Sequence, residues 1–139
     1  MDKYIGFDID SNKTSVCIVQ KNKADKYATI GPEVGSMKKF LANERKGGFR
    51  MNLTFEISGQ AGFLYDHLIG CVDSIKVANP DKMTWIYRTA KKNDRMDARK
   101  MAVLLSIGEI PAVHMTSKVL WTPYGEQDTC IVLWTPYGV

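Results

Sequence analysis

The hydrophobic and polar positions at the start of the chain follow the pattern of β-strands. Residues 3–20 hold two β-rich runs on either side of the polar stretch 10–13, which predicts a hairpin. A shorter run at residues 24–31 predicts a third strand, which Gly31-Pro32 ends. We therefore expect a three-stranded meander at the start of the fold.

The pattern then alternates between helical and extended segments. Apolar residues spaced by three and four predict amphipathic helices, and apolar–polar alternation predicts strands. This reasoning predicts a helix over 33–45, a strand over 50–57, a helix over 60–70, a strand over 72–78 and a helix from Asp94 onward. The order predicts an α/β fold, in which helices flank a mixed sheet and the later strands join it through helical crossovers. Residues 81–92 are polar and basic, and their pattern is ambiguous.

The predicted strands and helices each have an apolar face and a polar face. In strand 50–57, Glu56 lies on the side opposite to Leu53 and Phe55. In helix 60–70, His67 falls near the apolar face, so we expect a core or boundary histidine rather than a ligand. The last helix has its apolar face at Met101, Leu104 and Leu105.

The tail has a different character. The sequence VLWTPYG occurs at residues 119–125 and again at 132–138, a repeat too brief for a solenoid. A small hairpin, an interaction tail and a cloning or frameshift remnant remain as alternatives. We expect residues 116–139 to be an appendage to a domain formed by residues 1–115.

Composition narrows the class of protein. The chain has 139 residues, of which 45% are hydrophobic and 24% are charged, as is typical of one globular domain. Its apolar runs are too short to cross a bilayer, and its start has no basic-then-apolar signal region, so we expect neither membrane insertion nor export. Three cysteines without a CxxC pair argue against a disulfide framework or zinc ribbon and indicate a cytoplasmic location. The net charge of +4 permits a polyanionic partner.

Four carboxylates are the candidate catalytic and metal-binding residues: Asp8, Glu56, Asp94 and Asp97. Asp8 lies within an apolar strand pattern, and Glu56 lies at the end of another, where sites gather in open α/β sheets. Asp94 and Asp97 are three apart at a helix start and can share a face. Such a cluster is unfavourable without cations, because like charges repel, and Mg²⁺ or Mn²⁺ would relieve the repulsion. Two such ions can activate a nucleophile at a phosphodiester.

Each acid also has an ordinary structural reading. Asp94 and Asp97 are equally suited to an N-cap and first helical turn, and for this pair alone capping is the commoner role. Glu56 can be an exposed strand residue, and Asp8 a turn partner of Ser11. Asp10 is a fifth nearby acid, but we expect it to shape the hairpin.

Four motifs in order carry a resemblance. YIGFDIDSNK, FEISG, VANP and KKNDRMDARKMA resemble the conserved elements of the N-terminal catalytic domain of the DEDD transposases, which include pilin-gene invertases and RNA-guided bridge recombinases. The match covers residues 3–112. It departs mildly from the family at Asn93 and at Ile57-Ser58.

The resemblance implies a RuvC-like, ribonuclease-H-type fold with a DEDD motif. Carried over, Asp8, Glu56, Asp94 and Asp97 take the catalytic and metal-binding positions, and Lys92 takes the lysine before the last pair. It implies a Mg²⁺- or Mn²⁺-dependent enzyme that cleaves and exchanges DNA strands in transposition or site-specific recombination. Family members continue into a second domain with a nucleophilic serine, which nothing after Thr116 resembles, so the chain is expected to be truncated and a full-length form to be a homo-oligomer.

Basic residues cluster beside the last acidic pair. Lys91, Lys92, Arg95 and Arg99 are candidates for contacts with DNA or a guide RNA, since such residues bind phosphates. The alternative is an ordinary solvated helix face.

Other functions remain open. A stand-alone RuvC-like junction resolvase needs the same acids without a second domain. GFDIDSNKTSVCIV also resembles the phosphate-binding hairpin of actin-like ATPases and sugar kinases, although those proteins are far longer. A nucleic-acid-binding fragment that is not an enzyme is the fourth reading.

Overall fold

The computed structural model of the chain describes residues 1–56, 60–79, 94–113, 115–121 and 127–134, with side chains for 1–56, 60–79 and 98–113. The strands are β1 (Asp2–Ile9), β2 (Thr14–Val19), β3 (Lys26–Ile30), β4 (Arg50–Glu56), β5 (Ser74–Ala78), β6 (Ala112–Val113), β7 (Met115–Trp121) and β8 (Gln127–Trp134). The helices are α1 (Val34–Glu44), α2 (Ala61–Leu68) and α4 (Asp94–Ser106), with a 3-10 turn η1 (Ile69–Cys71).

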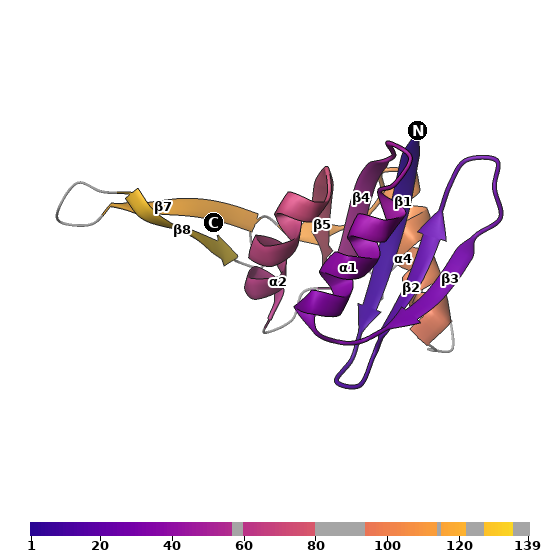
Figure 1. The fold of residues 1–139 in the computed structure, drawn as a ribbon, viewed down its shortest axis with the longest axis horizontal. Helices are drawn as coiled ribbons and strands as arrows, with labels where there is room; N and C mark the ends of the chain where they lie inside the picture. Colours follow the sequence, from indigo (N-terminus) through magenta and orange to yellow (C-terminus); the bar gives the residue numbers. More distant parts are fainter. Residues whose placement is uncertain (57–59, 80–93, 114, 122–126, 135–139) are drawn as a thin grey trace.

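Within the described part of the chain, six strands form one mixed sheet in the order β3-β2-β1-β4-β5-β6. Strands β1, β2 and β3 form the antiparallel meander that the sequence predicts. Strands β4 and β5 then add parallel to β1, and β6 pairs antiparallel with β5. Helices α1 and α2 lie on one face of the sheet and α4 on the other (Figure 1). The predicted α/β class with a mixed, helix-flanked sheet is therefore confirmed.

The β1–β2 hairpin is held by its turn residue Asp10. One carboxylate oxygen of Asp10 accepts hydrogen bonds from the backbone N–H groups of Asn12 and Lys13, at 2.7 and 2.9 Å. The backbone N–H of Asp10 donates to the carbonyl of Lys13 at 2.9 Å. This local closure is the usual reason for aspartate in a turn, and it confirms the structural role predicted for Asp10.

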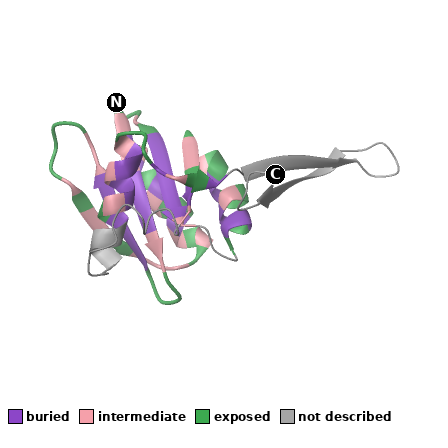
Figure 2. Ribbon diagram, turned by 180° about the vertical axis from the view of Figure 1, so that it is seen from behind, coloured by how far each residue is buried: buried purple, intermediate pink, exposed green. Residues whose placement is uncertain are grey.

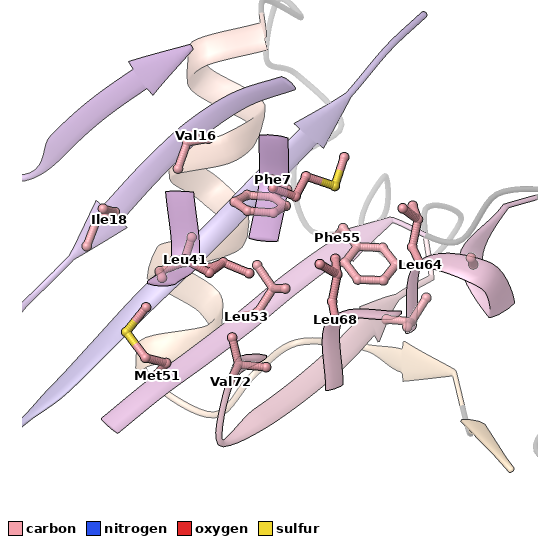
Figure 3. Packing of buried hydrophobic residues seen from close by; sticks show 14 of the residues in the cluster. Phe7, Val16, Ile18, Leu41, Met51, Leu53, Phe55, Leu64, Leu68 and Val72 are labelled. Atoms are coloured by element: carbon pink, nitrogen blue, oxygen red, sulfur yellow. The ribbon is translucent and has the colours of Figure 1, made fainter. Parts of the chain in front are cut away.

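The main core lies between the sheet and helices α1 and α2. Figure 3 shows the aromatic rings of Phe7 and Phe55 among side chains from the two helices. Leu41 of α1 and Leu68 of α2 are completely buried in this cluster. Burial of this kind is the largest favourable contribution to folding, so this cluster stabilises the packing of α1 and α2 on β1 and β4.

The end of α1 is fastened to the sheet by a buried ion pair. The Lys3 ammonium lies 3.2 Å from one carboxylate oxygen of Glu44, and Lys26 lies 2.9 Å from the other. Burial alone would raise the pKa of Glu44, but the hydrogen bonds from Lys26 and Lys3 outweigh it and lower that pKa below its ordinary value. Glu44 is therefore charged in the folded protein and joins α1 to β1 and β3.

Helix α4 covers the opposite face and approaches β1 very closely. A methyl group built on Gly6 would overlap the carbonyl oxygen of Ala98 and lie 3.0 Å from the backbone nitrogen of Ala102. Further along the helix, Met101 and Leu105 are buried beside Tyr4. The helix therefore runs antiparallel to β1, and its first turn lies toward the carboxyl end of that strand.

Helix α2 corrects one prediction. Leu64 and Leu68 are buried as expected, but Phe63 is 55% exposed and His67 is exposed as well. Their rings contact each other at a tilt of 54°, with centroids 4.3 Å apart. The expectation that His67 is a core or boundary residue is wrong, because the buried stripe of this helix is too narrow to include it. Figure 2 shows the exposed positions of α2 beside its buried ones.

The segment after β6 forms a separate antiparallel pair, β7–β8, in which Val119 is opposite Cys130. Figure 1 shows this pair extending beyond α2, away from the six-stranded sheet. Of the alternatives for the tail, the structure therefore has a hairpin, whereas the division at residue 115 into two domains stays a prediction. No helix within the described ranges is long and apolar enough to span a membrane.

Candidate functional site

Two of the four predicted acids lie at matching positions on neighbouring strands. The parallel register of β1 and β4 pairs Gly6 with Thr54 and Phe7 with Phe55, and Asp8 and Glu56 are the next residue on each strand. Side chains alternate along a strand, so these two carboxylates lie on the face opposite to Phe7 and Phe55, which is the α4 face. Both residues are half-buried.

The other two acids belong to the first turn of α4, where only the backbone is described. Asp94 begins the helix and Asp97 immediately precedes Ala98, the residue that packs over Gly6. Asp94 is four residues before Ala98, so its position lies one helical turn further toward the carboxyl end of β1. The backbone thus brings the start of α4 to the sheet end that carries Asp8 and Glu56, while the side chains of Asp94 and Asp97 lie outside the described part.

The predicted nucleic-acid contacts are only partly covered by the structure. Lys91 and Lys92 lie outside the described residues, as does the side chain of Arg95. Arg99 is described, and its Nε lies 2.9 Å from a carboxylate oxygen of Asp25, just before β3. This hydrogen bond raises the pKa of Arg99. Arg99 therefore stays charged and is held against the meander, with its side chain 52% exposed.

Two hydroxyl residues near the acids were missed by sequence reasoning. Ser15 is directly opposite Asp8 in the β1–β2 pair and is buried. Thr54 is completely buried one position before Phe55, and its hydroxyl has no hydrogen-bond partner among the described residues. The hairpin alone was enough to find Ser15, because a turn over residues 10–13 places it opposite Asp8.

The donor set at this end of the sheet fits a hard divalent cation. Asp8 and Glu56 are carboxylates at neighbouring positions on one face of the sheet, and oxygen is the ligand that Mg²⁺ prefers. Among the described residues no group of three or more His, Cys, Asp or Glu gathers in one place, and that set excludes Asp94 and Asp97. The described part therefore supplies two candidate ligands, and the start of α4 carries two more acids toward the same end.

No protein-family model and no curated protein sequence matches the chain. The chemistry of the site therefore follows from the arrangement of its own residues.

Proposed function

We propose that the chain is the divalent-metal-dependent catalytic domain of a DNA transposase or site-specific recombinase that resembles the DEDD transposases. Asp8, Glu56, Asp94 and Asp97 are the proposed ligands of Mg²⁺ or Mn²⁺. When bound, such ions activate a water or hydroxyl and stabilise the leaving oxygen at a phosphodiester. DNA is the proposed substrate.

The observation that carries the proposal is the register of β1 and β4. It aligns Asp8 with Glu56, although 47 intervening residues separate them in the chain (positions 9–55). Two carboxylates at adjacent strand ends repel each other unless a cation lies between them or one of them binds a proton. A site at the carboxyl ends of parallel strands is also where open α/β sheets bind ligands.

The fold supports the same proposal. A meander extended by parallel strands through helical crossovers is consistent with the ribonuclease-H-type, RuvC-like fold that the resemblance implies. In this arrangement Gly6 allows α4 to lie directly on β1, and the first turn of that helix carries the remaining two acids. The protein's own contribution is therefore to hold four acids from three separate segments at one end of the sheet.

Cleavage of labelled DNA tests the proposal. Linear and branched duplexes are incubated with the chain in Mg²⁺ or in EDTA, and the same assay is run on Asp8→Asn and Glu56→Gln. Both variants should lose metal-dependent cleavage while remaining folded by circular dichroism. Asp10→Asn is the matched control, because Asp10 is a neighbouring acid engaged in the turn. Cleavage restricted to branched DNA would favour the junction-resolvase reading, and wild-type cleavage by Asp8→Asn would contradict the assignment.

Thermal unfolding gives a second readout that does not depend on turnover. Mn²⁺ should raise the unfolding temperature of the wild-type chain and of Asp10→Asn, because a ligand that binds only the folded state stabilises it. It should leave Asp8→Asn unchanged.

A further inference from the structure

The candidate acids belong to a longer row of polar residues across the sheet. Thr29 on β3 is opposite Ser15 on β2, and Ser15 is opposite Asp8 on β1. Glu56 follows at the matching position of β4. Neighbouring strands lie about 4.8 Å apart, so Ser15 is one strand spacing from Asp8 and Thr29 is two, about 10 Å away.

The hydroxyl end of this row opens into a hollow. A hollow of about 330 Å³ lies on β2 and β3 and is lined by Ser15, Val16, Tyr27, Ala28 and Thr29. That volume is at the small end of the range of ligand sites. It is enough for a small polar group rather than a whole cofactor.

Three of the five residues that line the hollow, Ser15, Tyr27 and Thr29, lie on the α4 face, beside the acids. Tyr27 packs against the buried cluster of Cys17, Ala98 and Ala102, which joins β2 to α4. Ser15 and Thr29 share this face with Tyr27, because each is two residues from the Cys17–Tyr27 pair on its own strand. Asp8 and the hollow are therefore neighbours on one surface.

A cation lies beside the same hollow. Arg99 of α4 follows Ala98, which packs with Tyr27 in the buried cluster, and its Nε donates a hydrogen bond to Asp25 at 2.9 Å. Asp25 is two residues before Tyr27, so the guanidinium lies at the Tyr27 end of the hollow, and half of the Arg99 side chain is exposed. Two hydroxyls and a guanidinium are hydrogen-bond donors that commonly bind phosphate oxygens.

We propose that Ser15 and Thr29, with Arg99 beside them, bind a phosphate of the DNA backbone. This phosphate is next to the scissile phosphodiester at Asp8 and Glu56. This inference rests on the proposed function and adds a direction to it: the bound strand leaves the acids across β2 toward β3. The two hydroxyls supply neutral hydrogen bonds, and Arg99 supplies the charge.

DNA affinity separates these contributions. Fluorescein-labelled branched DNA is titrated with the Asp8→Asn chain in EDTA, where cleavage does not occur, at a series of NaCl concentrations. Ser15→Ala and Thr29→Val, each added to Asp8→Asn, should weaken binding about two- to tenfold at every salt concentration, as expected for one lost hydrogen bond. Arg99→Gln should weaken binding and also reduce the slope of log affinity against log salt by about 0.9, because one phosphate contact is lost.

Ser36→Ala is the matched control, since it removes a hydroxyl from α1 on the other side of the sheet and should not change affinity. Thr29 is exposed, so its substitution tests the inference even where Ser15→Ala affects folding. Unchanged affinity of Thr29→Val, together with an unchanged salt slope of Arg99→Gln, would overturn the inference while leaving the metal site in place. Metal-dependent cleavage by Asp8→Asn would instead overturn the proposed function itself.

Discussion

Replacing Gly6 by alanine should separate α4 from the sheet. Gly6 does not have a left-handed backbone, so alanine is not excluded by its conformation. The obstacle is packing, because the new methyl group would overlap the carbonyl oxygen of Ala98 and lie 3.0 Å from the nitrogen of Ala102. Both neighbours are backbone atoms of a helix, and neither can rotate away as a side chain would.

The expected cost follows from how far the helix must move. Carbon contacts prefer about 3.5–4.0 Å, and a gap of 0.5–1 Å forfeits about a quarter to a half of the dispersion energy of a contact. Lifting α4 would open such a gap beneath its buried residues Met101 and Leu105. Overpacking typically costs about 1–3 kcal/mol, and we expect Gly6→Ala to be at the upper end of that range.

Urea unfolding followed by circular dichroism measures this cost. With a slope of about 2 kcal/mol per molar urea, a loss of about 2–3 kcal/mol lowers the midpoint by about 1–1.5 M. Gly35→Ala is the matched control, because Gly35 lies inside α1 with no atom within 4 Å of an added methyl group. That variant should gain about 0.5–1 kcal/mol from the helix propensity of alanine. An unfolding midpoint of Gly6→Ala equal to or above wild type would refute the close packing of α4 on β1.

Three further substitutions test other parts of the structure. Glu44→Gln should destabilise the chain by about 3 kcal/mol, because it leaves the buried Lys3 ammonium without its carboxylate. Since the pKa of Glu44 is lowered on folding, the stability that its charge contributes is present above the ordinary pKa of 4.5 and is lost as pH falls below it. Between pH 6 and pH 3 the urea midpoint of the variant should therefore fall less than that of the wild type. Thr54→Val should unfold at or above the wild-type temperature in scanning calorimetry, because it removes a buried hydroxyl without a described partner, and a loss of more than about 1 kcal/mol would contradict that view. Asp10→Ala should lower stability by about 1 kcal/mol in urea through the loss of two turn hydrogen bonds, and an unchanged midpoint would count against the turn described.

The elements that the sequence predicted well are those with a strong local cause. The meander follows from β-rich runs separated by a turn in which Asp10 closes its own hydrogen bonds. The α4 stripe follows from helical spacing, and Met101 is indeed 1% exposed. Strand β6 was not predicted, because two residues are too few to show a period and their pairing partners on β5 are 34 and 36 residues away.

In the candidate site, too, some features were predicted from the sequence and others were not. The sequence predicted Asp8 from an apolar strand pattern and Glu56 from a strand end, and the register of β1 and β4 brings them to neighbouring positions on one face. His67 was misplaced because the whole of α2 was expected to bury a wide face, whereas only the stripe of Leu64 and Leu68 reaches the core. The hollow beside Ser15 depends on how three strands and α4 meet, which no local pattern records.

Crystals soaked in Mn²⁺ give the most direct test of the central claim. Anomalous scattering locates the ion without assumptions about activity. We predict a peak within coordination distance of both Asp8 and Glu56, which disappears when Asp8→Asn crystals are soaked in the same way. A fully occupied wild-type crystal with no peak between these two carboxylates, or with the same peak in Asp8→Asn, would contradict the account.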